Sequence, residues 1–503
     1  MDSKAHAYRE LLYPLVGLVL GTLWFAYNLS LPPSQLGWEC CDGAEYIGRA
    51  MQEKVWSSSG HRTFGYPFFL SLFIPIFDFI PSADPRCWIS AAMVAQLIIW
   101  FLSAWILFRA LRRMDQRYSP LLLGLLFAHP ALTSYAAMPL TDSLSVSLFC
   151  LTVTFLLSLQ KRYERPFAPC FGIGLCLGLI TTMRPSYQVI GIMTGATISI
   201  FSVARGISSR HSLKRILTIC LCSTCAFLFG FLPPYLKTAK NCYDQFGYFC
   251  LLDRESMQKV SRTSLFMSVT SVRWWSSGTT GFRNTNDNYM WVAAFGCNFQ
   301  EIPADHTLSW LASCYTKIPT VLPVIFVKKI VAGFDNYLLN AYTTDETAPW
   351  ERVLNRVFSI PAFLGFLLAL GVVLRALFQR TILNYLYLVV PIGYLLFQVN
   401  FHIESRYFFP TYPLFFLFFF IKASEFLAGS WTKRICFVSF SVLCTGVFLF
   451  QTLYWDLRDC LYNYTQVHEG TPRYGLMLAC PPKEEVDRKL DRYFSWIPMW
   501  PTP

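Results

Sequence analysis

The sequence predicts an all-α protein that crosses a membrane many times, and two observations support this prediction. The 503 residues are 54% hydrophobic and only 14% charged, whereas soluble domains carry about a quarter charged residues. Apolar runs near the length of a membrane span, about 20 residues, recur along almost the whole chain. Because a helix satisfies its own backbone hydrogen bonds in hydrocarbon, these runs are expected to be helices.

The net charge of +12 does not indicate nucleic-acid binding. Lysine and arginine are spread over short segments between apolar runs, as the positive-inside rule expects, and they form no separate basic domain. We therefore place these segments in the cytosol and derive the topology from them. The segments are residues 109–117, 161–165, 205–215, 375–380 and 433–434.

The cytosolic segments require an even number of crossings between them, and this decides the role of the run at 64–80. If the run at 11–27 leaves the cytosol, Asp42 lies outside, and only one of the next two runs crosses before the first cytosolic segment. The run at 64–80 is short and broken by two prolines. We expect it to be an interfacial or re-entrant helix on the outer side, and the run at 87–107 to be the span.

The same parity, continued along the chain, gives about eleven crossings. The long polar and aromatic stretch near 237–320 exceeds an ordinary loop and is expected to pack on the outer side. The run at 321–334 contains Lys328 and Lys329, so we expect a second interfacial helix there. The expected spans are residues 11–27, 87–107, 121–137, 143–159, 171–183, 187–203, 216–235, 357–377, 382–399, 407–421 and 436–454.

Four segments follow from this topology. Residues 1–235 form an N-terminal transmembrane module whose first outer loop is 28–86, and residues 236–356 form an outer-face loop with an interfacial helix. Residues 357–454 hold the C-terminal transmembrane helices, and residues 455–503 form an outer-face tail.

The 17 cysteines fall into two groups. Those inside apolar runs are expected to be small packing residues. Those in polar segments are candidates for disulfides if the segments face an oxidising compartment. No spacing typical of a metal site stands out. The polar group includes Cys40, Cys41, Cys242, Cys250, Cys460 and Cys480.

Acidic residues on the outer side are the first candidates for chemistry. Asp42 and Glu45 lie in the first outer loop, and Asp142 follows the second one at the start of a span. If Asp42 has no functional role, it is a solvated loop acid or the start of a short amphipathic helix. If Asp142 has no functional role, it is the N-cap of the helix, a position that Thr141 or Ser143 could also take.

Two arginines at helix ends are the second set of candidates. Arg184 lies between an apolar run and Pro185, and Arg406 begins an aromatic span. A guanidinium next to hydrocarbon is costly and tends to be functional, and its planar fork suits a phosphate. If these arginines have no functional role, their side chains extend to the lipid head groups. Outer arginines together with outer acids indicate a functional site more strongly than any of these residues alone.

These residues lie in motifs that resemble the GT-C superfamily of glycosyltransferases, which use lipid-phosphate sugars. The superfamily includes the protein O-mannosyltransferases and the aminoarabinose lipid A transferases. The order and spacing of the motifs agree over most of the first 240 residues and again near residue 400. The motifs are Asp42-Gly-Ala-Glu-Tyr46-Ile-Gly-Arg-Ala50, Gly65-Tyr66-Pro67-Phe-Phe-Leu70, Leu140-Thr141-Asp142-Ser143-Leu144, Met183-Arg184-Pro185 and Arg406-Tyr407 with Pro410.

The chain departs from both subfamilies. Protein O-mannosyltransferases have Asp-Glu where this chain has Asp42-Gly43, and His-Pro-Pro near Pro67. The aminoarabinose transferases carry an acid before that proline, where this chain has His61-Arg62-Thr63. The resemblance therefore leaves the acceptor open.

The resemblance implies a GT-C-like bundle with a polyprenyl- or dolichyl-phosphate-linked sugar as donor and a lipid, glycan or protein as acceptor. It implies that Asp42 is the general base of an inverting displacement, and that Arg184 and Arg406 bind the lipid phosphate. Asp142 would orient the acceptor or Asp42, or bind a divalent metal, although no ligand set requires a metal. The expected substrate-binding residues are Glu45, Tyr46, His61, Arg62, Tyr66, His402 and Glu404.

The implied location is a multi-pass membrane protein with its active site on the non-cytosolic face. We expect the bacterial inner membrane with the site facing the periplasm, and the ER membrane is the alternative. A multi-span transporter or lipid flippase is the rival function, since it also needs many spans and intramembrane charges. An assembly protein or pseudoenzyme of the same fold is a third interpretation.

Overall fold

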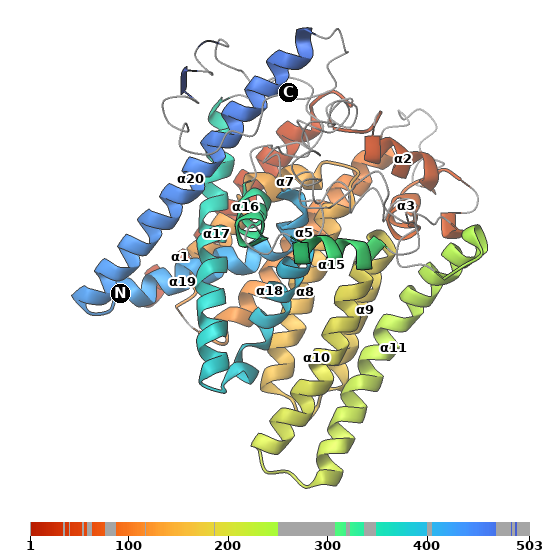
Figure 1. Cartoon of the computed structure of the whole chain (residues 1–503), viewed down its shortest axis with the longest axis vertical. Coiled ribbons are helices and arrows are strands. Elements are labelled where there is room, and N and C mark those ends of the chain that lie inside the picture. Colours follow the sequence, from red (N-terminus) through yellow and green to blue (C-terminus); the bar gives the residue numbers. More distant parts are fainter. Residues whose placement is uncertain are drawn as a thin grey trace. The chain divides into compact units, whose positions relative to one another are not determined.

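The computed structural model confirms the all-α class. Within the residues that it describes, every regular element is an α-helix or a 3-10 helix (Figure 1). The chain forms two compact units: Met1–Asp253 with Gly365–Tyr394 and Phe409–Glu425, and Arg254–Leu364 with Leu395–Phe408 and Phe426–Pro503. The structure describes the chain except residues 1, 34–35, 40, 53–54, 58–62, 76–86, 116, 186, 250–306, 318–321, 336–348, 400–404, 469–483, 485–487 and 490–503.

The chain is a polytopic membrane protein. Seven helices of the described residues are long and apolar enough to cross a bilayer, and two shorter apolar helices, Phe167–Met183 and Ile382–Gln398, accompany them. The count of about eleven crossings stays a prediction. The seven are Glu10–Leu29, Cys87–Arg112, Thr141–Lys161, Tyr187–Ser208, Leu213–Phe246, Val353–Phe378 and Trp431–Leu453.

Helix α9 (Phe167–Met183) packs against α8 (Thr141–Lys161), α10 (Tyr187–Ser208) and α11 (Leu213–Phe246) in the first unit (Figure 1). Glycines let α9 and α11 approach backbone to backbone, as is common between membrane helices. A Cβ added at Gly178 would lie 3.0 Å from the carbonyl oxygen of Phe231. Further helices of this unit are α1 (Asp2–Leu29) and α5 (Cys87–Arg112).

The expected span at 121–137 is not one continuous helix, and whether it crosses the membrane stays a prediction. The structure has two short helices there, α6 (Pro120–Phe127) and α7 (Pro130–Ala136), with a break at Ala128 and His129. Pro130 explains the break because it has no N–H to donate and its ring would clash with the carbonyl of the preceding turn. The break lets α7 lead into a compact turn that ends at the start of α8.

The segment expected to be the first outer loop contains the helices α2 (Cys41–Ala50) and α3 (Gly65–Ser71), which pack against each other. With seven residues, α3 is too short to cross the hydrocarbon. This length agrees with an interfacial or re-entrant helix at 64–80, although residues 76–80 lie outside the described part.

Basic residues lie together where α5 and α8 end. From the sequence, we expect these residues in the cytosol. The Lys161 ammonium, at the end of α8, donates to the carbonyl of Arg113, 3.0 Å away and just beyond α5. Arg112 forms an ion pair with Glu10 of α1. The ends of α1, α5 and α8 are therefore level with one another.

Helix α16 (Leu322–Phe334) organises the described part of the second unit, with the start of α17 (Pro349–Phe378) and with α20 (Trp431–His468). Directly after α16, the buried Asp335 pairs with Arg356 of α17, with 3.0 Å between Oδ1 and Nε. With 13 residues, α16 is shorter than a membrane span, as the expected interfacial helix requires.

Two described cysteines are disulfide-bonded: Cys242 in α11 and Cys314 in α15 (Thr307–Lys317). Cys242 is one of the polar-segment cysteines for which a disulfide was expected, and this expectation is confirmed. Cys314 was not among the cysteines named there, although it lies in the polar stretch 237–320. Cysteines of the apolar helices, such as Cys150 and Cys176, are free thiols, as expected for packing residues.

Candidate active site in the first unit

Asp142 lies in the first turn of α8 and is buried. The N-cap of this helix is Leu140, which has an extended backbone and makes no side-chain capping bond. The alternatives in which Asp142, Thr141 or Ser143 caps the helix are therefore wrong. The Asp142 carboxylate is used in a tertiary contact instead.

That contact is an ion pair with Arg184, the residue that ends α9. The guanidinium donates from Nε to Oγ1 of Thr141, 2.7 Å away, and from a terminal nitrogen to Oδ1 of Asp142. Arg184 has an extended backbone (φ −138°, ψ 102°) because the following Pro185 disfavours a helical conformation. The proline thus ends α9 at the point where the arginine reaches α8.

Tyr66 of α3 is hydrogen-bonded near this pair and lies within electrostatic range of Asp142. Its hydroxyl donates to Oε1 of Gln96, 3.0 Å away in α5. The amide nitrogen of Gln96 donates to the carbonyls of Ala136 and Met138, at 3.2 and 3.1 Å. Burial raises the pKa of Tyr66 well above its usual value, and charges on Tyr46 and Asp142 raise it further. Tyr66 is therefore a neutral hydrogen-bond donor to Gln96.

The helix that carries Asp42 lies beside the turn before α8. A Cβ added at Gly43 would lie 2.8 Å from Cγ of Pro139, and closer still to the carbonyl oxygen of Gly37. Asp42 is partly exposed in the first turn of α2, next to this point of contact. The first-turn residues Asp42 and Asp142 thus belong to adjoining segments.

Other expected site residues of α2 also have defined neighbours. Tyr46 packs edge-to-face on Tyr66, with ring centroids 5.0 Å apart. Glu45 forms an ion pair with Arg49 one turn later, with 2.9 Å between Oε1 and the guanidinium nitrogen. In this structure, Tyr46 therefore faces the site, while Glu45 is engaged within α2.

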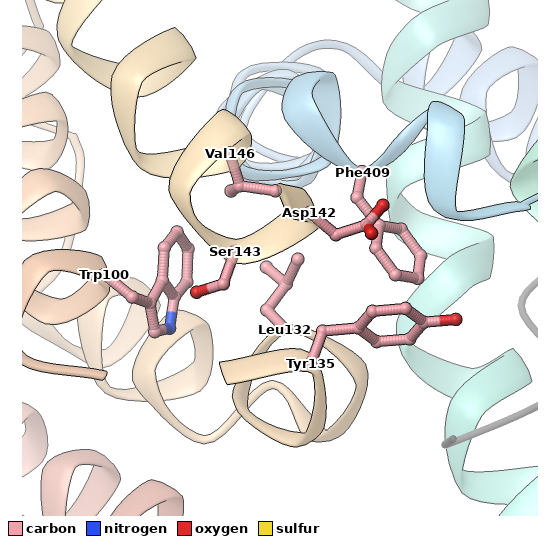
Figure 2. A pocket seen from close by; sticks show the side chains of 7 residues that line it. All are labelled: Trp100, Leu132, Tyr135, Asp142, Ser143, Val146 and Phe409. Carbon is pink, nitrogen blue, oxygen red and sulfur yellow. The ribbon is translucent and has the colours of Figure 1, made fainter. Parts of the chain in front are cut away.

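A narrow hollow lies beside Asp142 (Figure 2). The side chains leave no room in it for a water molecule. Tyr135 of α7 packs edge-to-face on Phe409, with ring centroids 4.8 Å apart, and closes one side. The hollow is lined by Trp100, Leu132, Tyr135, Asp142, Ser143, Val146 and Phe409.

Arg406 belongs to the second unit and is buried in a 3-10 turn, Ser405–Tyr407. Helix α16 holds both flanks of the segment that carries it. The Lys329 ammonium donates to the carbonyl of Val399, 2.9 Å away. On the other flank, the ring of Phe408 packs on Phe334 at 5.2 Å and lies over Gly333. The expected site residues His61, Arg62, His402 and Glu404 lie outside the described residues.

Sequence reasoning missed several residues that the structure places around Tyr66 and Asp142. Gln96 had a detectable signal, because it is the only amide in the long apolar run of α5. Trp100 and Phe409 had none, since aromatic residues are frequent throughout the apolar runs. Tyr187 and Tyr394, joined by a 2.8 Å hydroxyl contact, lie within electrostatic range of Arg184 and Asp142.

A metal site was an alternative role for Asp142. Among the described residues, no three His, Cys, Asp or Glu side chains gather as a metal ion would need. The Asp142 carboxylate binds a guanidinium there.

No protein-family model matches the chain, and no curated protein sequence matches it. Solved structures that align with it include the archaeal oligosaccharyltransferase AglB from Archaeoglobus fulgidus in complex with an inhibitory peptide and a dolichol-phosphate. This alignment has 12% identity and a TM-score of 0.42, and it covers 99% of this chain and 60% of that one. The Archaeoglobus fulgidus oligosaccharyltransferase in the apo form gives 13% identity and a TM-score of 0.44 at the same coverage.

ArnT from Cupriavidus metallidurans in the apo state also aligns, with 14% identity, a TM-score of 0.33, and coverage of 84% of this chain and 79% of that one. These proteins are GT-C glycosyltransferases, the superfamily that the sequence motifs resemble. This chain spans 60% of the length of the oligosaccharyltransferase. With TM-scores of 0.33 to 0.44, the function proposed below rests on the residues of the site.

Proposed function

We propose that the chain is a glycosyltransferase that moves a sugar from a polyprenyl-phosphate-linked donor to an acceptor on the non-cytosolic face. The observation that carries the proposal is the buried ion pair of Asp142 and Arg184, with the Asp42 helix packed against the turn before Asp142. Together these segments hold a partly exposed carboxylate and a guanidinium, the two groups that transfer from a phosphate ester needs.

The proposed reaction is a single displacement at the anomeric carbon. Asp42 accepts the proton of an acceptor hydroxyl while the acceptor oxygen bonds to the anomeric carbon. The bond from that carbon to the phosphate oxygen breaks, and the oxygen keeps the electron pair as the carrier phosphate leaves. A positioned general base contributes about 10²- to 10⁴-fold to such a step.

Arg184 is the proposed stabiliser of the leaving phosphate. A guanidinium has five N–H donors in a planar fork, so it can bind a carboxylate and a phosphate together. Asp142 and Thr141 hold the fork in place. Arg406 is proposed as a second phosphate ligand because Arg406-Tyr407 with Pro410 resembles the late arginine motif of the GT-C superfamily.

The ends of the helices support a non-cytosolic site. At about 1.5 Å per residue, Asp142 lies about 29 Å along α8 from Lys161. Lys161 lies beside Arg113, in the basic region that the positive-inside rule assigns to the cytosol. Cys242, in the last two turns of α11, is disulfide-bonded, which favours an oxidising compartment at that end.

A lipid flippase is the second candidate, because two features of the structure are also typical of transporters. The Asp142–Arg184 pair is buried between apolar helices, and the helix at 120–136 is broken at His129. A flippase would move the same lipid without changing it. The two functions therefore differ in whether bare polyprenyl phosphate is produced.

The test uses purified protein in detergent, where sidedness is lost and transport has no chemical product. The protein is mixed with polyprenyl-phosphate sugars and a membrane extract as the acceptor source, and released polyprenyl phosphate is measured by mass spectrometry. The proposal expects release by the wild type and a loss of about 100-fold or more for Asp42→Asn. A flippase gives no release, and a pseudoenzyme is indifferent to the substitution. Mass spectrometry of lipid-linked sugars with and without the protein would then name the donor.

A further inference from the structure

Two polar side chains of the hollow beside Asp142 have no hydrogen-bond partner within the described part of the chain. They are the indole N–H of Trp100 in α5 and the hydroxyl of Ser143 in α8. Both residues are more than nine-tenths buried, at 1% and 3% exposure. Figure 2 shows the Ser143 hydroxyl pointing towards the Trp100 ring.

Such groups are uncommon in folded proteins. More than about nine in ten buried polar groups have a partner, and those without one are usually matched by an ordered water. Here the side chains leave no room for a water. Burying the Trp100 N–H and the Ser143 hydroxyl in this state is therefore costly, and a polar atom entering the hollow would relieve that cost.

The rest of the lining indicates what kind of molecule would enter. Trp100, Tyr135 and Phe409 provide aromatic rings, Leu132 and Val146 provide aliphatic surface, and Asp142 provides a carboxylate. A small-molecule site typically combines such apolar walls with a few placed polar groups. A hexose has both apolar C–H faces and hydroxyls that donate and accept, so it matches these walls and these polar groups.

Two of the elements around the hollow are short. Phe409 lies in a three-residue 3-10 helix, and Tyr135 lies in the seven-residue helix α7. Neither residue is inside a long span. Movement of these two short elements would widen the hollow and leave α5 and α8 in place.

We propose that Trp100 and Ser143 form the hydroxyl-binding part of a subsite for the transferred sugar, which is closed in this structure. The proposal rests on the proposed transferase function and adds the place where the sugar is recognised. The Trp100 N–H donates to one sugar oxygen, and the Ser143 hydroxyl exchanges a hydrogen bond with another. The neighbouring Asp142 and Arg184 would then lie between the sugar and the carrier phosphate.

The experiment compares bare undecaprenyl phosphate with its glucosyl, mannosyl and galactosyl esters as ligands of the full chain in detergent. Binding is followed by thermal shift and by native mass spectrometry. The variants are Ser143→Ala, which removes the hydroxyl with little change of volume, and Trp100→Phe, which removes the N–H and keeps an aromatic ring. The matched control is Trp105→Phe on the same helix, where the tryptophan is 44% exposed.

The expected result is that at least one glycosyl ester binds the wild type more tightly than bare undecaprenyl phosphate. Ser143→Ala and Trp100→Phe each weaken binding of that ester by about tenfold or more, or ~1.4 kcal/mol, and leave the dissociation constant of bare carrier within about twofold. Ser143→Ala also melts at the same temperature as the unliganded wild type or higher, because it removes a buried group without a partner. Trp105→Phe changes neither affinity.

Three outcomes overturn the subsite. A sugar preference that survives both variants shows that these groups do not bind the sugar. A wild type that binds bare carrier and glycosyl esters equally shows that the hollow takes no sugar. A Ser143→Ala variant that melts several degrees lower shows that the hydroxyl is already satisfied in the free protein. By contrast, a wild type that does not bind bare undecaprenyl phosphate rejects the proposed function itself, and the subsite with it.

Discussion

The Asp142 carboxylate and the Arg184 guanidinium join the first turn of α8 to the residue that ends α9. Their side chains are only 1% and 12% exposed. Two charges removed from water to this extent are stable only as a pair, because each neutralises the field of the other. The pair thus has a structural role in holding two helix ends, as well as the proposed role at the phosphate.

Removing one member of this pair should destabilise the fold strongly. Arg184→Met leaves the Asp142 charge buried, and we expect a loss of about 3–5 kcal/mol in the free energy of unfolding. The measurement is chemical or thermal denaturation in detergent. The control is Arg215→Met, which breaks an ion pair with Glu164 whose side chains are 52% and 49% exposed, and should cost about 1 kcal/mol or less.

The double variant Arg184→Met with Asp142→Asn decides whether the cost comes from the unpaired charge. Because the asparagine carries no charge, it should recover part of the lost stability. Equal losses in the single and double variants would show that the arginine acts through its packing alone. Activity should be absent in both, since the proposed phosphate ligand is gone.

Glycine at position 43 should be required for activity because it allows the Asp42 helix to approach Pro139. A Cβ at this position would lie 2.8 Å from Cγ of Pro139 and closer still to the carbonyl oxygen of Gly37, so Gly43→Ala should move α2 and the carboxylate of Asp42. A displacement of about 1 Å can cost about 100-fold in rate. We expect a loss of this size in the release of polyprenyl phosphate.

Gly48 provides the matched control on the same helix. Among the described residues, no atom lies within 4 Å of a Cβ added there. Gly48→Ala should therefore keep full activity and stabilise α2 by about 1 kcal/mol through helix propensity. If Gly43→Ala were as active as Gly48→Ala, the contact with Pro139 would not position Asp42.

Much of the fold could be predicted from the sequence, because a membrane span is a local property. About 20 apolar residues must become a helix in hydrocarbon, whatever they pack against. The run at 121–137 was the exception. Its hydropathy indicated one span, but the single Pro130 divides it into two helices, and average hydropathy does not detect such a break.

The site could be predicted only in part. Charge parity selected Asp42, Asp142 and Arg184 as residues of one face, and the structure brings their segments together in one unit. Charge parity did not reveal the ion pair of Asp142 and Arg184. These partners are 42 residues apart and meet only through the packing of α8 on α9. Trp100 was missed for a related reason. Its unsatisfied N–H depends on neighbours from three other elements, which no spacing in the sequence records.

The buried Lys329 should make stability depend on pH. Burial lowers the pKa of Lys329 from 10.5 to about 7, so the folded chain binds fewer protons than the unfolded chain between these values. Stability contributed by this site therefore rises as pH increases from 7 towards 10.5, and the full penalty of the buried charge is present below pH 7. The slope for one proton is at most about 1.4 kcal/mol per pH unit.

Lys329→Met isolates this effect. The stability of the wild type relative to the variant should increase between pH 7 and 9, measured by denaturation in the same detergent. Lys240→Met, which removes a lysine that is 66% exposed, corrects for the general loss of a positive charge. A difference between wild type and Lys329→Met that stays constant across this range would contradict the shifted pKa.

The proposed topology places two natural cysteines on opposite faces of the membrane. It can therefore be tested by labelling without introducing new cysteines. Cys87 begins α5 at the end expected outside, and Cys436 follows the basic Lys433 and Arg434 at the cytosolic start of α20; both are exposed free thiols. A membrane-impermeant maleimide added to intact cells or sealed vesicles of known orientation should label Cys87 and reach Cys436 only after permeabilisation. Cys87→Ser and Cys436→Ser identify each signal, and peptide mass spectrometry locates the label. If both cysteines were labelled from the same side, the parity that makes 64–80 an interfacial helix would be wrong, and Asp42 would no longer be assigned to the non-cytosolic face.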